Sequence, residues 1–155
     1  MLHCVGMQVA TGSENWWARI RAGVPVSGSE KTALVIGCGY TGTRLARRLM
    51  ERGFRVVGVS RRADQNPELK HAGIQPMAGD LSEPDFVSAL GALAPALVAY
   101  FVPPQKSNDP LAAVVAATRT PALEAFLYAS SSSVYGDCGG EWVDETTTIS
   151  SSGTG

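Results

Sequence analysis

The chain has 155 residues, enough for one domain, and 45% of them are hydrophobic, enough for a buried core. Its 13 Lys and Arg residues against 14 Asp and Glu residues leave a net charge of −1, with no basic excess for nucleic acid or an anionic membrane. Cys4, Cys38 and Cys138 form neither a metal-type CxxC pair nor a disulfide framework, which favours a reducing, cytoplasmic location.

Residues 1–30 carry little information. Met1–Ala10 is mildly apolar, but it has no basic start and is too short to cross a membrane, so we predict neither a signal peptide nor a membrane span. We expect an N-terminal arm at 1–30 that is disordered, docks on the domain or derives from an upstream start codon. A single domain at 31–145 and a flexible Ser/Thr/Gly-rich tail at 146–155 would follow.

The next segment has the pattern of a strand, a tight turn and a helix. The apolar run Ala33–Ile36 leads into Gly37-x-Gly39-x-x-Gly42, after which the hydrophobic period becomes helical. The helix has one apolar stripe, formed by Gly42, Leu45, Ala46, Leu49 and Met50, and it ends at Gly53 before a second buried strand at Phe54–Val59. This is a βαβ unit, the unit of a parallel sheet.

The three glycines have separate roles in a dinucleotide-binding turn. Gly37 would permit the sharp turn, Gly39 would let a pyrophosphate approach the backbone, and Gly42 would let the helix lie close to the sheet. The N–H groups at the helix N-terminus, where Tyr40 and Thr41 lie, would bind the phosphates. The alternative is a glycine turn needed only for packing. A protein-kinase glycine loop is excluded because it requires a following strand.

The end of the second strand bears on which dinucleotide binds. NAD-selective sites usually place Asp or Glu there, but this chain has Ser60 followed by Arg61 and Arg62. A hydroxyl and two guanidinium groups can bind a 2′-phosphate, which a carboxylate would repel. We therefore prefer NADP to NAD as the cofactor. The alternative is that both arginines belong to a solvated loop.

Helical and strand patterns alternate through the remaining chain. In order, we expect one or two helical turns in residues 63–71, a strand at Ile74–Ala78, a helix opened by a capping box at Ser82–Asp85 and running to Leu93, a strand at Leu97–Val102, a helix capped by Asp109 with Pro110 at its first position, and a strand at Ala125–Ala129. This order predicts an α/β fold, a Rossmann-type doubly wound parallel sheet with helices on both faces.

Three more motifs join the glycine turn: Gly79-Asp80-Leu81, Ser131-x-x-Val134-Tyr135-Gly136 and Val143-Asp144-Glu145-Thr146. With these four stretches the sequence resembles the extended and atypical short-chain dehydrogenase/reductases, the NAD(P)-dependent epimerase/dehydratase group. The resemblance covers residues 33 to about 146. The glycine spacing departs from the GxxGxxG of the extended group and is more similar to the atypical branch.

The resemblance implies roles for three residues. Asp80 would accept a hydrogen bond from the adenine amino group, with Leu81 beside the ring. Ser131 would be the catalytic Ser/Thr that hydrogen-bonds the substrate hydroxyl or carbonyl. The alternatives are a turn or helix-entry role for Asp80 and no special role for Ser131, which is one serine among four at a strand end.

The other residues of these motifs have weaker assignments. The family's Val-Tyr-Gly tyrosine is not its base, so Tyr135 would serve in packing or line the substrate side. Asp144 and Glu145 are interpreted as loop anchors. The family's Tyr-x-x-x-Lys pair, whose lysine lowers the tyrosine pKa for proton transfer, is absent; its tyrosine would fall at or just past Gly155, so we expect a C-terminally truncated chain.

Two functions of different class remain open. The first is the NAD(P)-binding portion of an oxidoreductase acting on a nucleotide-sugar-like or other hydroxyl/carbonyl small molecule. A homo-oligomer is a possible assembly of such a protein. The second is a regulatory or sensor module that binds NADP without turnover. A methyltransferase with the same glycine turn is disfavoured, because Ser60 replaces its acidic ribose contact.

Overall fold

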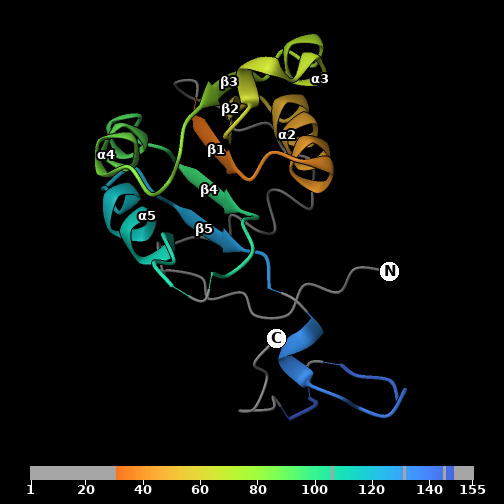
Figure 1. Ribbon diagram of the computed structural model, residues 1–155. Helices are drawn as coiled ribbons and strands as arrows, with labels where there is room; N and C mark the ends of the chain where they lie inside the picture. Colours follow the sequence, from red (N-terminus) through yellow and green to blue (C-terminus); the bar gives the residue numbers. More distant parts are fainter. Residues whose placement is uncertain (1–30, 106, 131, 145, 149–155) are drawn as a thin grey trace.

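Five parallel strands form the central sheet of the computed structural model, which describes residues 31–105, 107–130, 132–144 and 146–148 (Figure 1). The strands are β1 (Thr32–Ile36), β2 (Arg55–Ser60), β3 (Gln75–Ala78), β4 (Leu97–Tyr100) and β5 (Ala125–Tyr128), in the order β3-β2-β1-β4-β5. The helices are α2 (Tyr40–Glu51), α3 (Pro67–His71), α4 (Pro84–Ala92) and α5 (Leu111–Thr118), with 3₁₀ turns η1 (Ala63–Gln65) and η2 (Ser132–Tyr135). The predicted doubly wound fold is confirmed.

Strand β1 is at the centre of the sheet, and all five of its residues are buried. It pairs with β2 on one side and with β4 on the other, so that Val35 lies opposite both Gly58 and Ala99. A strand with helices on both of its faces is expected to be apolar, as this one is after its first residue, Thr32. Strand β3 is at one edge, where Pro76, which has no N–H to donate, is tolerated.

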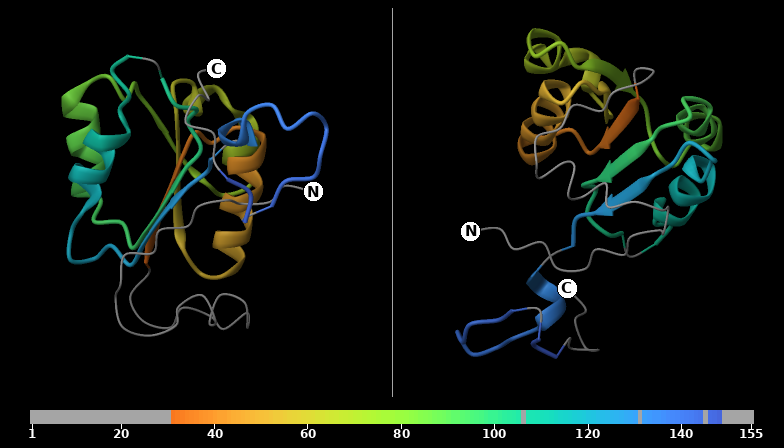
Figure 2. Two further views of the ribbon diagram at one scale, coloured as in Figure 1. Left: turned by 90° about the horizontal axis from the view of Figure 1, so that it is seen from below. Right: turned by 180° about the vertical axis from the view of Figure 1, so that it is seen from behind.

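Helices cover both faces of the sheet, α2 and α3 on one and α4 and α5 on the other (Figure 2). Successive residues of a strand point to opposite faces. Ala33 and Val35 accordingly pack in the core cluster that contains residues of α2, whereas Leu34 and Ile36 pack with residues of α4 and α5. Within the described part of the chain, no helix is long and apolar enough to cross a membrane.

Helix boundaries depend on local chemistry that the sequence indicated in part. Gly53 and Gly73 follow α2 and α3 with φ of +84° and +72°, the left-handed conformation expected of a glycine that ends a helix. Asp109 accepts a hydrogen bond from the first residue of α5, since its Oδ1 lies 2.9 Å from the N–H of Leu111, but it is one residue before the N-cap position that was predicted for it. Pro110 is the N-cap residue rather than the first helical residue.

Two further boundary predictions are wrong. No side chain caps α4: the N-cap residue is Glu83 and not Ser82, and Glu83 makes no side-chain bond there, while the Ser82 hydroxyl donates to Asp80. Strand β4 ends at Tyr100 and not at Val102, three residues before Pro103. The predicted arm at 1–30 and most of the predicted tail at 146–155 are outside the described residues.

Candidate functional site

A groove of about 1180 Å³ opens at the carboxyl ends of the strands. Its walls are residues 36–39, 59–62, 66–67, 79–82 and 101–105. These segments follow β1, β2, η1, β3 and β4 in turn. Ligands of open parallel α/β sheets bind at this end of the strands, beside the point where the strand order reverses, which here lies between β1 and β4.

The glycine turn is fixed to the neighbouring strand β2. The N–H groups of Gly37 and Cys38 both donate to the carbonyl oxygen of Val59, at 2.9 and 3.0 Å. Gly37 has φ of +84°, and a β-carbon there would lie 3.0 Å from the carbonyl carbon of Phe101. Both the conformation and the lack of space require glycine at position 37, as predicted for the sharp turn.

Gly42 and Gly39 differ in what surrounds them. A β-carbon on Gly42 would lie 2.7 Å from the Gly37 carbonyl oxygen and 3.2 Å from a methyl group of Val35, so Gly42 allows α2 to approach the sheet. A β-carbon on Gly39 would have nothing within 4 Å. Gly39 lines the groove, so its missing side chain leaves room beside the backbone for a ligand.

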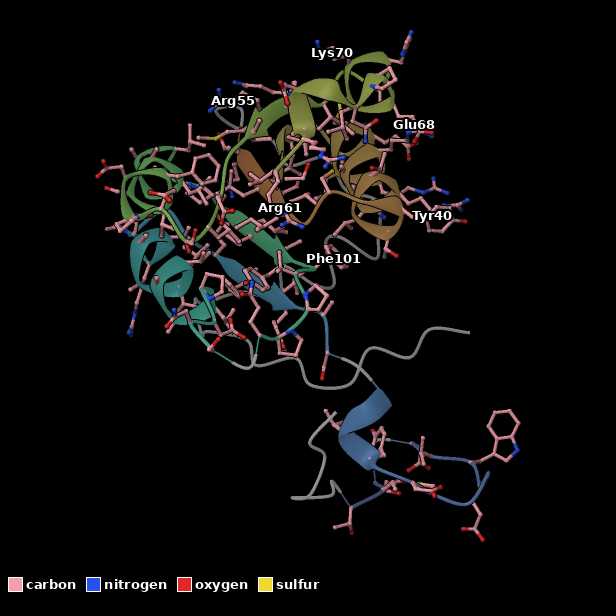
Figure 3. The ribbon with its side chains drawn as sticks, in the orientation of Figure 1. Tyr40, Arg55, Arg61, Glu68, Lys70 and Phe101 are labelled. Atoms are coloured by element: carbon pink, nitrogen blue, oxygen red, sulfur yellow. The ribbon has the colours of Figure 1, made fainter. Side chains whose placement is uncertain are left out.

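The N-terminus of α2 faces this turn. No side chain caps it, and its first turn has no acidic residue. The N–H groups of Tyr40, Thr41 and Gly42 have no partner within the helix, and the positive end of the helix dipole lies there, so an anion can bind. The Tyr40 side chain is not part of the groove: it is 77% exposed and packs against Arg44, whose guanidinium carbon is 4.4 Å from the ring centre (Figure 3).

Ser60, Arg61 and Arg62 line the groove where β2 ends. Ser60 is partly buried, and both arginines are exposed. In the described part of the chain, neither arginine forms an ion pair with a carboxylate. Figure 3 shows Arg61 and Phe101 at the carboxyl end of the sheet. Both guanidinium groups are therefore available to an anionic ligand.

Asp80 and Leu81 line the groove beyond β3. Asp80 Oδ1 accepts hydrogen bonds from the N–H and the hydroxyl of Ser82, both at 2.9 Å. These two bonds, together with the positive charge of Arg61, lower the pKa of Asp80. The turn role considered for Asp80 is thus real. It uses one carboxylate oxygen and leaves the other for a ligand.

The segment Phe101–Gln105 was missed as part of the site. It follows β4 and forms a wall of the groove, while Asn66 and Pro67 contribute another part. The signal was present, because the rule that assigns Asp80 to the end of β3 applies equally to the end of β4. From the sequence we predicted only that a strand ends at Val102.

Cys38 is in the turn and is buried. Its side chain is 2% exposed, and its sulfur lies 3.8 Å from the Thr43 hydroxyl. Burial raises the pKa of the Cys38 thiol, with a smaller opposing effect of the Thr43 hydrogen bond. A small residue that fits the turn explains Cys38 better than a redox role.

The motifs after β5 are only partly described. Ser131 and Glu145 are outside the described residues. Tyr135 is 6% exposed, and its hydroxyl has no partner among the described residues, which favours packing. Asp144 anchors its loop by accepting bonds from the N–H and hydroxyl of Thr146, at 2.9 and 2.7 Å, and these lower its pKa. The described residues contain no group of three or more potential metal ligands among His, Cys, Asp and Glu.

The strand order, the glycine turn and the groove together define a Rossmann-type α/β domain. The model of the NAD dependent epimerase/dehydratase family matches residues 33–153. The chain therefore belongs to this family, which implies a nicotinamide dinucleotide as cofactor. No curated protein matches the sequence.

Solved structures agree with this assignment. A protein of Methylobacillus flagellatus, provisionally named an NAD-dependent epimerase/dehydratase, is 30% identical with a TM-score of 0.62, over 79% of this chain and 44% of that one. A conserved protein of unknown function from Silicibacter pomeroyi is 31% identical with a TM-score of 0.59, over 77% and 42%. A protein of Burkholderia cenocepacia, provisionally named an epimerase, is 22% identical with a TM-score of 0.62, over 79% and 44%, and supports the fold alone. The chain thus spans less than half the length of these structures.

Proposed function

We propose that the chain binds NADP in the groove, as the cofactor-binding part of an epimerase/dehydratase-type oxidoreductase. Its substrate would be a nucleotide-sugar-like or other small molecule with a hydroxyl or carbonyl group. The observation that carries the proposal is the open space beside Gly39, next to the uncapped N-terminus of α2. A diphosphate needs both features: room for close approach, and N–H groups to bind it.

The remaining walls of the groove fit the two ends of the adenosine part. The free oxygen of Asp80 can accept a hydrogen bond from the adenine amino group, and Leu81 can contact the ring. Ser60, Arg61 and Arg62 can bind a 2′-phosphate with charge-assisted hydrogen bonds. Since the end of β2 has no carboxylate for a free 2′-hydroxyl, these residues support NADP over NAD.

The chemistry of the reaction would be supplied by the nicotinamide, which exchanges hydride with a substrate carbon. The described residues of this chain bind and orient the cofactor. We further propose that Ser131, three residues beyond the end of β5, hydrogen-bonds the reacting oxygen of the substrate. That placement follows the family motif.

A second candidate is an NADP-binding regulatory module without turnover. One observation favours it: none of the four tyrosines in the sequence is followed by a lysine at the fourth position. The family's usual proton-transfer pair is therefore not contained in these 155 residues.

Isothermal titration calorimetry with NADPH and NADH tests the proposal. We expect both to bind, NADPH at least about tenfold more tightly because of its extra charge-assisted bonds. Turnover of a panel of carbonyl substrates is measured on the same protein. Binding with turnover supports the oxidoreductase, binding without turnover supports the regulatory module, and the absence of heat with either nucleotide refutes both.

A further inference from the structure

The wall of the groove formed by Phe101–Gln105 is held at its two ends by different means. At its start, the N–H of Phe101 donates to the carbonyl oxygen of Ile36 at 2.7 Å, and its backbone packs against Gly37. Val102 packs against the core cluster, and the next point at which a backbone N–H can fix the wall lies beyond Pro103 and Pro104, which have no N–H group to donate.

That fixed point is Asp109. Its Oδ2 accepts a hydrogen bond from the N–H of Gln105 at 3.0 Å, and its Oδ1 accepts one from the N–H of Leu111 at 2.9 Å. Gln105 is the first residue after the prolines that can donate from its backbone. One carboxylate therefore ties the far end of the wall to the first turn of α5. Asp109 itself does not line the groove.

The negative charge of Asp109 disfavours a direct contact with the cofactor. A carboxylate repels a dinucleotide that carries several phosphate charges, so on charge alone its loss should strengthen binding. If the carboxylate instead helps binding, it must act through the position of the wall. The two effects have opposite signs, and a measurement can separate them.

We propose that Asp109 is a positioning residue for the dinucleotide: through Gln105 it holds the Phe101–Gln105 wall in the conformation that accepts the cofactor. This rests on the proposed function of the groove. When the bond to Gln105 is lost, the wall samples other conformations, and the apparent affinity falls by the fraction of time spent in the competent one.

Asp109→Asn separates the two bonds. Asparagine caps helices as well as aspartate does, so its side-chain oxygen can keep the bond to Leu111. Its NH₂ group cannot accept the N–H of Gln105, so the bond to the wall is lost. The stability of the domain should therefore be retained while the wall is released. Asp85→Asn is the matched control, because it removes the same charge from the first turn of α4, outside the groove.

Calorimetric titration of NADPH into the wild type and both variants measures whether Asp109 raises or lowers the affinity for the cofactor. We expect Asp109→Asn to weaken binding about tenfold, with a melting temperature within about 2 °C of wild type, while Asp85→Asn binds at least as tightly as wild type. Unchanged or tighter binding by Asp109→Asn overturns the positioning role and leaves the proposed function intact. A wild type that binds no nucleotide overturns both.

A measurement on the wild type keeps the test valid if the variant fails to fold. The Gln105 amide, although it lies on an exposed segment, should exchange its hydrogen at least about tenfold more slowly than an unbonded amide, as followed by NMR. Exchange at the unprotected rate would show that the bond to Asp109 is not held in solution, and would overturn the inference.

Discussion

A β-carbon on Gly42 would lie 2.7 Å from the carbonyl oxygen of Gly37, so the close contact between these two residues of one motif requires glycine at position 42. Gly37 turns the chain at the end of β1, and Gly42 lets the first turn of α2 rest on that turn. Gly39, between them, meets nothing within 4 Å. The motif thus contains two glycines that the fold requires and one that only a ligand would require.

Gly42→Ala should therefore reduce the stability of the fold, whereas Gly39→Ala should reduce the affinity for the cofactor. Gly42→Ala overpacks the contact with Gly37 and should lower the free energy of unfolding by about 1–3 kcal/mol in urea denaturation. Gly39→Ala should change it by less than about 1 kcal/mol, because the methyl group enters open space, yet weaken NADPH binding at least about tenfold in titration. Wild-type affinity in Gly39→Ala would show that the phosphates bind elsewhere.

Arg61→Glu should change the preference between the two cofactors. Replacing the guanidinium by a carboxylate removes a charge-assisted bond to the 2′-phosphate and adds repulsion, so NADPH affinity should fall by roughly 10- to 100-fold. NADH has no 2′-phosphate and should lose no more than about threefold. Fluorescence titration of both nucleotides measures this.

Arg47→Glu is the control for Arg61→Glu, since Arg47 is an exposed residue of α2 outside the groove and the change in net charge is the same. It should leave the ratio of the two affinities unchanged. If Arg61→Glu weakens NADH and NADPH equally, Arg61 contacts a part common to both nucleotides, and the argument for NADP selectivity fails.

The centre of the fold was predictable because several independent signals coincide there. Between Ala33 and Val59, hydrophobic period, glycine spacing and the helix-ending Gly53 all indicate the same βαβ unit, and the structure contains it. The ends of elements were less predictable. Ser82 had the sequence position of a helix cap, but α4 begins two residues later, at Pro84, and Ser82 instead donates its N–H and hydroxyl to Asp80 in the preceding turn.

The site was predictable where a motif marks it and was missed where backbone geometry alone creates it. Gly39, Arg61 and Asp80 line the groove as expected. The Phe101–Gln105 wall has no motif, and only its position directly after a predicted strand indicated that it lies at the same edge of the sheet. Assignment of Ser131 still rests on the family pattern.

Cys38 should react slowly with iodoacetamide despite lining the groove. Only the thiolate reacts, and burial raises the pKa of this thiol, so less thiolate exists at a given pH and the sulfur is hard to reach. We expect alkylation at least about tenfold slower than that of the partly exposed Cys138, and slower again with NADPH. Peptide mass spectrometry over time measures both rates.

The control for Cys38 is the same reaction in concentrated guanidinium chloride, where the two cysteines should react at similar rates because burial is lost. Raising the pH should speed the reaction of native Cys38 as thiolate forms. Faster labelling of Cys38 than of Cys138 in the native protein would contradict the burial of Cys38 in a closed turn. An alkylation rate of Cys38 that does not change with NADPH would contradict its position beside the cofactor.

Tyr100→Phe should stabilise the domain. Tyr100 is 1% exposed, and its hydroxyl has no partner among the described residues. The free-energy cost of removing this hydroxyl from water is therefore not offset by a hydrogen bond in the folded wild type. Removing the oxygen while keeping the ring contacts with Phe126 and Tyr128 should raise the free energy of unfolding by about 1 kcal/mol in urea. A loss of stability would reveal a hydrogen bond to this hydroxyl.

The same variant should be less sensitive to alkali. Burial, with the nearby charge of Asp109 and Tyr128 adding to it, raises the pKa of Tyr100 from 10.0 to about 12. The unfolded chain therefore releases this proton at lower pH than the folded protein, and wild type loses stability as the pH rises through that window. Tyr100→Phe has no such proton, so its stability advantage should grow between pH 10.0 and about 12. Parallel unfolding curves of the two proteins across this range measure the difference, and a constant difference would show that the phenol titrates alike in both states.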